Sequence, residues 1–201
     1  MNTTMICPKL AYSIALFVLL YSLSGCTKTT ETVKPEETPF TALTGSSSLT
    51  FSSSANNNAF ELGTAFSPSV DGKITKLGCK LTDAGSYRVT LWNFTTKAVL
   101  RQVTIEQSTP DKLTLETIDP LAVTKDSRYM VSVNNQSAGA NRKYALYKRV
   151  QGGSVYPIVA GNLLLSGFYL TTGSAAVFPT TQVTSDQNYL IGLPELVFVP
   201  N

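Results

Sequence analysis

The chain has 201 residues, of which 16 are basic, 13 are acidic and none is histidine, so its formal net charge is +3. This charge is far below the basic surface that nucleic-acid binding requires, and we expect no nucleic-acid partner. The lack of histidine in the sequence excludes Ser-His-Asp triads, Cys-His dyads and His-ligated metal sites. We expect neither a cofactor nor a metal site; the alternative is a structural calcium ion, for which Asp71, Asp83 and Asp186 could supply oxygen ligands.

The start of the chain has a basic residue, an apolar run and then small residues before a cysteine. Lys9 is followed by mostly apolar residues at 10–21, and the tetrapeptide at 23–26 is Leu-Ser-Gly-Cys. This order resembles the signal peptide and lipobox of bacterial lipoproteins. A membrane-spanning helix needs about 20 apolar residues, so this run is too short to span. We expect a cleaved signal peptide at 1–25 and acyl chains on Cys26, which would hold the protein on the bacterial envelope, at the outer membrane. The alternative is an ordinary secretory signal with an incidental cysteine.

Residues 26–46 are predicted to form the lipidated cysteine and a flexible tether, because their Thr, Glu, Pro and Ser content is too polar to bury a face. Cys7 would leave with the signal peptide and Cys26 would carry lipid, so Cys79 would be the single thiol of the mature chain. Without histidine to generate a thiolate, we expect Cys79 to be a small buried strand residue.

Residues 47–201 are predicted to form one all-β domain. Short runs of Val, Ile, Thr, Tyr and Phe alternate with Gly, Asn, Asp and Pro, which is typical of strands and turns, and no segment has a sustained helical period. Sheets of this size hide their apolar sides by packing face to face, which favours an antiparallel β-sandwich of jelly-roll type. The predicted strands are 48–53, 60–66, 73–81, 87–94, 98–106, 112–118, 129–134, 144–148, 162–171 and 189–199.

Alternation within the segment 87–93 predicts which of its side chains face the core. Successive side chains of a strand point to opposite faces. We expect Tyr87, Val89 and Leu91 to face the core and Trp92 to point away from it.

Several short segments carry a family resemblance through their order along the chain: 61–66, 70–74, 89–92, 98–100, 120–123, 129–132, 178–179, 188–190 and 196–198. They resemble the bacterial domain of unknown function 4082 across most of residues 59–198. The resemblance implies a β-sandwich of a kind often appended to secreted, carbohydrate-related bacterial proteins, and it implies no activity for any named residue.

The candidate ligand-binding residues are three aromatic side chains and a polar loop. Trp92, Tyr144 and Tyr147 are candidate platforms for sugar rings, since an aromatic ring offers a large contact area. Asn141 and Arg142 are candidate hydrogen-bonding partners of sugar hydroxyls. Each aromatic residue has the alternative of being part of the core.

We therefore expect a non-enzymatic, lipid-anchored module that binds glycans or mediates adhesion. The alternative is a structural or protein-interaction subunit of an envelope complex. An anchored glycosidase would need two carboxylates roughly 5 to 9.5 Å apart across one cleft. The available acids show no recognisable pairing in the sequence: Glu61, Asp71, Asp83, Glu106, Asp111, Glu116, Asp119, Asp126, Asp186 and Glu195.

Overall fold

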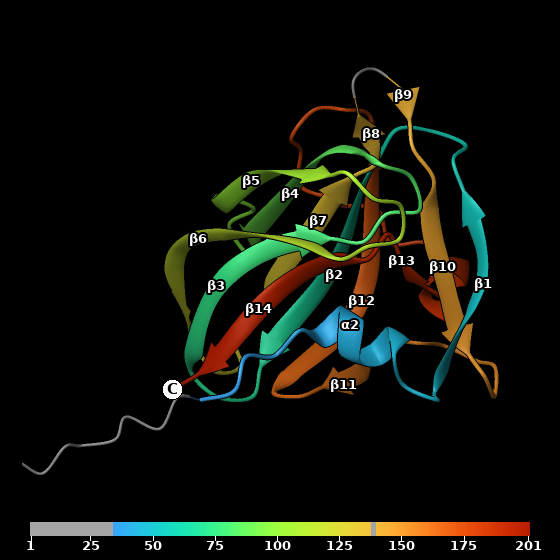
Figure 1. Cartoon of the computed structure of the whole chain (residues 1–201). Coiled ribbons are helices and arrows are strands. Elements are labelled where there is room, and N and C mark those ends of the chain that lie inside the picture. Colours follow the sequence, from blue (N-terminus) through green and yellow to red (C-terminus); the bar gives the residue numbers. More distant parts are fainter. Residues whose placement is uncertain (1–33, 138–139) are drawn as a thin grey trace, which may run out of the picture. The chain divides into compact units, whose positions relative to one another are not determined.

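A computed structural model of the chain describes residues 34–137 and 140–201 (Figure 1). The predicted signal peptide, Cys7 and the predicted lipidation site Cys26 lie outside these residues. Within the described ranges, no helix is long and apolar enough to cross a membrane.

The described residues form antiparallel sheets that pack as the predicted β-sandwich. The largest sheet has the order β11-β12-β2-β7-β4-β5, with β11 at Ile158–Ala160, β12 at Leu163–Thr172, β2 at Phe60–Pro68, β7 at Tyr129–Asn134, β4 at Gly85–Asn93 and β5 at Val99–Gln107. Across it lies the sheet β14-β3-β6, with β14 at Pro194–Pro200, β3 at Gly72–Cys79 and β6 at Thr114–Val123 (Figure 1).

A third sheet stands beside these two layers (Figure 1). Its order is β1-β10-β13, with β1 at Leu49–Ala55, β10 at Tyr144–Arg149 and β13 at Leu190–Ile191. A short hairpin pairs β8 at Gln136–Ser137 with β9 at Ala140–Asn141, and a 3-10 helix, η1, covers Thr184–Asn188.

Each of the predicted strand segments contains a strand, and the differences have local causes. The segment 189–199 is split into β13 and β14 because Gly192 and Leu193 take positive φ angles of 78° and 44°. β6 runs past its predicted end through Pro120, which an edge strand tolerates because one side of its backbone makes no ladder bonds. The short strands β8, β9 and β11 were not predicted, since two or three residues carry no period.

The main core lies between the layers and contains the residues expected there. Tyr87, Val89 and Leu91 of β4 are fully buried in it, as the alternation predicts. Cys79 of β3 is also fully buried, and burial raises the pKa of its thiol to about 12. The prediction that Cys79 is a small buried strand residue is confirmed.

The folded domain begins before the expected boundary at Ser47. Residues 34–46, predicted to belong to the tether, include the helix α2 at Pro39–Thr44, and its Phe40 and Leu43 are part of the core. Just before α2, the backbone of Glu37 exchanges hydrogen bonds of 2.8 and 2.9 Å with Phe198 of β14. A six-residue helix in a polar segment is too short to show a helical period, so the packing of this part of the chain could not be predicted from its residues.

A buried carboxylate fixes α2 to the domain. Glu195 of β14 is 1 % exposed and accepts hydrogen bonds from the Thr41 backbone N–H and the Thr41 hydroxyl, both at 2.7 Å. It also accepts a bond of 3.3 Å from the Phe40 backbone N–H. Burial raises the pKa of Glu195 to about 7, although the hydrogen bonds from Thr41, Leu196 and Phe40 act in the opposite direction.

We predict that Glu195 makes folding stability depend on pH. Its pKa is higher in the folded chain than in the unfolded chain, where about 4.5 applies, so the folded state binds the proton more tightly. Proton binding by Glu195 therefore contributes to the free energy of unfolding. This contribution is complete below about pH 4.5 and is lost as the pH rises through about 7, and its upper limit is about 3 kcal/mol. Urea unfolding of the wild type and of Glu195→Gln at pH 5 and pH 8 measures it. Between pH 5 and pH 8, the wild type should lose more free energy of unfolding than Glu195→Gln does. A difference between the two proteins that is the same at both pH values would contradict the prediction.

Candidate functional site

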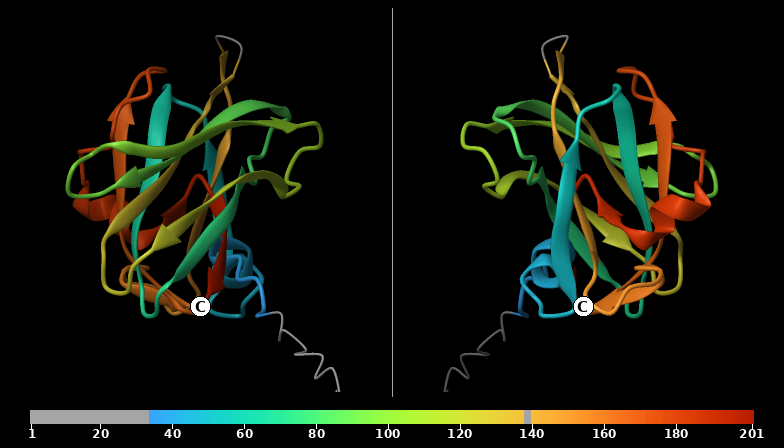
Figure 2. Two further views of the ribbon diagram at one scale, coloured as in Figure 1. Left: turned by 90° about the vertical axis from the view of Figure 1, so that its left-hand side faces the viewer. Right: turned by 90° about the vertical axis from the view of Figure 1, so that its right-hand side faces the viewer.

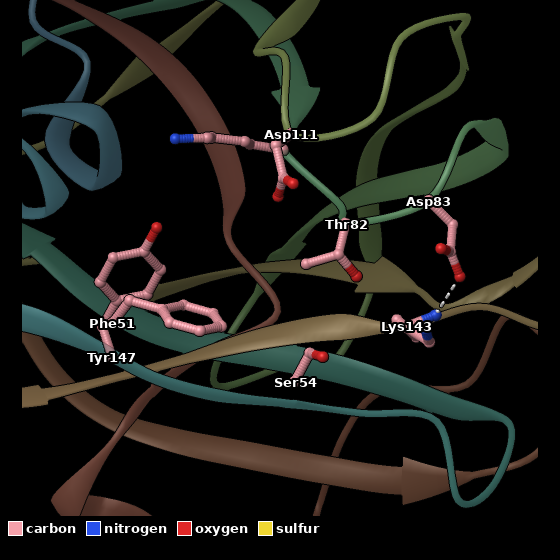
Figure 3. A pocket seen from close by; sticks show the side chains of 8 residues that line it. Phe51, Ser54, Thr82, Asp83, Asp111, Lys143 and Tyr147 are labelled. Atoms are coloured by element: carbon pink, nitrogen blue, oxygen red, sulfur yellow. Dashed lines mark hydrogen bonds between the residues drawn. The ribbon is translucent and has the colours of Figure 1, made fainter.

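A pocket of about 430 Å³ lies between the β1–β10 pair and the loops that follow β3 and β5 (Figure 3). Its volume lies within the range of small-molecule sites, about 300 to 1,000 Å³. The lining residues are Phe51, Ser54, Lys80, Thr82, Asp83, Asp111, Lys143 and Tyr147. They come from four separate parts of the chain, so the pocket exists only in the folded domain.

Two aromatic rings form one wall of the pocket. Phe51 and Tyr147 are register partners on β1 and β10, and their ring centroids are 5.8 Å apart at an interplanar angle of 79°. Phe51 is 54 % exposed, which is unusual for so large an apolar side chain. Burial, together with the negative charge of Asp111, raises the pKa of Tyr147. The Tyr147 hydroxyl therefore stays protonated and can donate a hydrogen bond.

The opposite wall is a loop held by a buried amide. The side chain of Gln107 accepts a hydrogen bond of 2.9 Å from the Leu81 backbone N–H and donates one of 2.6 Å to the Leu81 carbonyl. It also donates one of 3.2 Å to the Asp83 carbonyl. The Asp83 carboxylate accepts the Lys143 backbone N–H at 2.8 Å, the dashed line in Figure 3. This wall is thus fixed before any ligand binds.

Several polar groups of the pocket have no partner among the described residues. They are the Thr82 hydroxyl oxygen, which is buried, the Asp111 carboxylate, the Tyr147 hydroxyl, and the ammonium groups of Lys80 and Lys143. A set of unpartnered donors and acceptors beside aromatic rings suits a polar ligand with an apolar face. In the described ranges, no group of three or more Cys, Asp and Glu side chains is placed to hold a metal ion.

The structure brings only one of the predicted ligand-binding residues, Tyr147, into this pocket. Tyr144 of the same strand instead lines a separate, mostly apolar cavity of about 240 Å³, and its hydroxyl bonds Asn57 at 3.0 Å. Asn141 is exposed at the end of β9, and Arg142 follows it outside the pocket lining. Phe51 was not predicted as a ligand-binding residue. The signal that could have identified it is an aromatic residue between polar residues in a predicted strand.

The expectation that Trp92 forms an exposed platform is wrong. Trp92 points away from the main core, as its place in β4 predicts, yet it is only 2 % exposed. Its ring meets that of Phe178 edge to face at a centroid distance of 5.8 Å, and its Nε1 donates to the Ser132 hydroxyl at 2.8 Å. Phe178 belongs to a segment after β12 that folds back over this face of the sheet, and strand alternation alone could not reveal that cover.

A buried ion pair fastens this covering segment to the sheet. The carboxylate of Glu61, fully buried on β2, accepts hydrogen bonds from Ser132 at 2.6 Å, from Asn134 at 3.1 Å and from Arg88 at 2.7 Å. The Arg88 guanidinium also donates to the backbone carbonyls of residues 174 and 175 at 2.8 and 3.0 Å. Both oxygens of the Glu61 carboxylate thus have internal partners, and the cluster serves the packing of the sheet.

The sheets and the pocket define this protein as an all-β sandwich with a preformed surface pocket. The chain belongs to the family described as a domain of unknown function, DUF4082, whose model matches residues 47–191. No curated protein matches the chain. The family predicted from the short ordered segments is confirmed, while α2 and β14 lie outside the matched residues.

We predict that the fluorescence of Trp92, the single tryptophan of the chain, reports its burial. Its emission should lie at short wavelength and be weakly quenched by acrylamide, because the ring is enclosed by apolar side chains. Unfolding in urea should shift the emission to longer wavelength. Phe178→Ala, which uncovers one side of the ring, should increase quenching, and strong quenching of the folded wild type would contradict the burial.

Proposed function

We propose that this protein is a non-enzymatic module of the bacterial cell envelope, lipid-anchored through Cys26, that binds a glycan in the pocket formed around Phe51 and Tyr147. The observation that carries the proposal is the exposed Phe51 ring set at 79° to Tyr147, facing an acid-bearing wall. A sugar ring has an apolar face that packs on an aromatic side chain and hydroxyls that bond carboxylates and phenols.

The rigidity of the pocket supports binding as its role. Gln107 is almost fully buried and bonds both Leu81 and Asp83, so the loop loses little conformational freedom when a ligand binds. A preformed site spends less of its interaction energy on ordering its own side chains.

The position of the first docked residue supports display close to a membrane. The packed segment begins near Glu37, eleven positions after Cys26 in the sequence. At roughly 3.5 Å per extended residue, a lipid on Cys26 would keep the domain within about 40 Å of the bilayer surface.

The alternative role, a subunit of an envelope assembly, would favour a contiguous apolar patch of more than a few hundred Å². Among the described residues, the exposed large hydrophobic side chains belong to separate elements, and only Val159 and Leu164 are strand partners. The full set is Phe51, Val70, Val99, Val150, Val159, Leu164 and Val177. This distribution favours the pocket over a broad protein interface.

We predict that Phe51→Ala and Tyr147→Ala each weaken glycan binding about tenfold, because each removes one aromatic contact worth about 1.4 kcal/mol. Glycan-array screening and calorimetry on the full chain, purified in detergent, measure the effect. Val159→Ala is the matched control, since it removes an exposed apolar side chain outside the pocket.

A folded protein that binds no glycan of a broad array would refute the proposal. Hydrolysis of a bound glycan, measured as new reducing ends and abolished by Asp111→Asn, would overturn its non-enzymatic part, since Asp83 and Asp111 line the same pocket.

We predict that Cys26→Ala releases the protein from membranes and removes its acyl label, because the acyl chains would supply the membrane affinity. Membrane fractionation and metabolic labelling with a fatty acid test it. Cys79→Ala is the control, since the buried Cys79 side chain has no access to a lipid donor and should leave retention unchanged. Retention and labelling of Cys26→Ala at wild-type levels would contradict the anchor.

A further inference from the structure

We propose that a second cavity of the domain binds a small organic amine, whose ammonium group lies at Asp186 and whose apolar body fills the interior of the cavity. This is the cavity of about 240 Å³ that Tyr144 lines together with Asp186, and we call it the Tyr144–Asp186 cavity. It shares no lining residue with the Phe51–Tyr147 pocket, so amine binding here does not depend on the proposed glycan binding.

The interior of the cavity is apolar and lies between two sheets. β2 and β12 of the largest sheet form one wall, and β10 and β13 of the third sheet form the other. The apolar side chains are Phe60, Leu62, Phe168, Leu170, Leu146 and Ile191. Leu62, Phe168 and Ile191 are buried, whereas the other three are partly exposed. An apolar cavity of about 150 Å³ is large enough to bind benzene, so this one has room for a six-membered ring with a short chain.

A single carboxylate provides the charge of this cavity. Asp186 of η1 is the one charged residue among the described residues that line it. The ion pairs of the described chain do not use Asp186, and the hydrogen bond from the Ser185 hydroxyl to its carboxylate is long, at 3.4 Å. The walls therefore carry one negative charge and no positive charge, which favours a cationic ligand.

The hydrogen-bonding groups beside Asp186 also suit an ammonium group. The Tyr144 hydroxyl donates its proton to Asn57 Oδ1 at 3.0 Å, so its oxygen remains available as an acceptor. Burial and then the negative charge of Asp186 raise the pKa of Tyr144, which keeps this proton in place. An ammonium group has three donors and no acceptor, and its bond to a carboxylate is about twice as strong as a bond between neutral groups. A primary amine thus fits this end of the cavity better than an alcohol does.

The 3-10 helix that carries Asp186 is fixed before any ligand binds. The side chain of Gln187 accepts a hydrogen bond from the Phe168 backbone N–H and donates one to the Phe168 carbonyl, both at 2.9 Å. The Gln187 carbonyl accepts the Val155 N–H at 2.8 Å. Arg149 donates to the carbonyls of residues 154 and 155, at 2.7 and 3.0 Å, and leaves Asp186 without a counter-charge. A site held in this way spends little interaction energy on ordering its own side chains.

Three small probes of similar shape and different charge test the inference on the full chain in detergent. They are 2-phenylethylamine, the neutral 2-phenylethanol and the anionic 3-phenylpropionate, and calorimetry at one detergent concentration measures their affinities. We expect the amine to bind about tenfold more tightly than the alcohol, and the anion to bind least.

Three variants locate the bound amine. Asp186→Asn should weaken binding of the amine about tenfold and leave binding of the alcohol unchanged, because it removes the charge and keeps the shape of the side chain. Leu170→Ala should weaken both by the same factor, since it removes a contact with the apolar body. Asp119→Asn, an exposed acid on β6, is the matched control and should change neither. The emission of Trp92 verifies that each variant is folded.

Each contrary result overturns the inference without touching glycan binding. Equal affinity for the amine and the alcohol, or a preference for the amine that survives Asp186→Asn, would overturn the role of Asp186. Loss of amine binding in Phe51→Ala, with none in Asp186→Asn, would place the amine in the Phe51–Tyr147 pocket instead. A folded protein that binds none of the three probes would overturn the cavity as an amine site, whereas the glycan array alone decides the proposed function.

Discussion

The central strands of the six-stranded sheet are buried on both faces. The rest of the molecule is arranged around this constraint. On β2, Leu62 and Phe66 fill the core between the layers, while Ala65 packs on the outer side with Trp92, Met130 and Phe178. The same strand carries Glu61 into this outer layer, where an unpartnered carboxylate would be very costly. Arg88, Ser132 and Asn134 satisfy it, and Arg88 also holds the covering segment, so packing and electrostatics close this face together.

The pocket lies away from this covered sheet. Phe51 lies on β1, an edge strand of the sheet β1-β10-β13, and Tyr147 lies on the neighbouring β10. The loop after β3 is held by Gln107, whose amide gives the loop backbone the hydrogen bonds that it would otherwise make with water. Rigid strands that position side chains on connecting loops are the usual arrangement of binding sites. In this domain, the lack of any disulfide among the described residues makes such buried polar contacts important for fixing the loops.

The two ends of the folded domain meet outside the residues shared with the family. α2 precedes the matched residues and β14 follows them, yet Glu195 of β14 bonds the first turn of α2 and Glu37 pairs with Phe198. The views of Figure 2 agree that α2 and the C-terminus lie at the same end of the domain. Residues 37–44 are therefore fastened to the sandwich itself, and the raised pKa of Glu195 links this fastening to pH.

Local pattern predicted much of this fold, because strand alternation and turn residues act over a few neighbours. It identified the strand segments, the core face of β4, the buried Cys79 and the family. It failed for α2, whose six residues are stabilised by Glu195, a partner far away in sequence, and for Trp92, which is covered by Phe178. Apart from Tyr147, the pocket could not be predicted from local pattern, since Phe51, Asp83, Asp111 and Lys143 meet only when separate elements pack together.

The sequence by itself determined which residues form strands and which face of a strand is apolar. Only the tertiary structure decided which outward faces are covered and which side chains share a pocket, because both depend on contacts between distant segments.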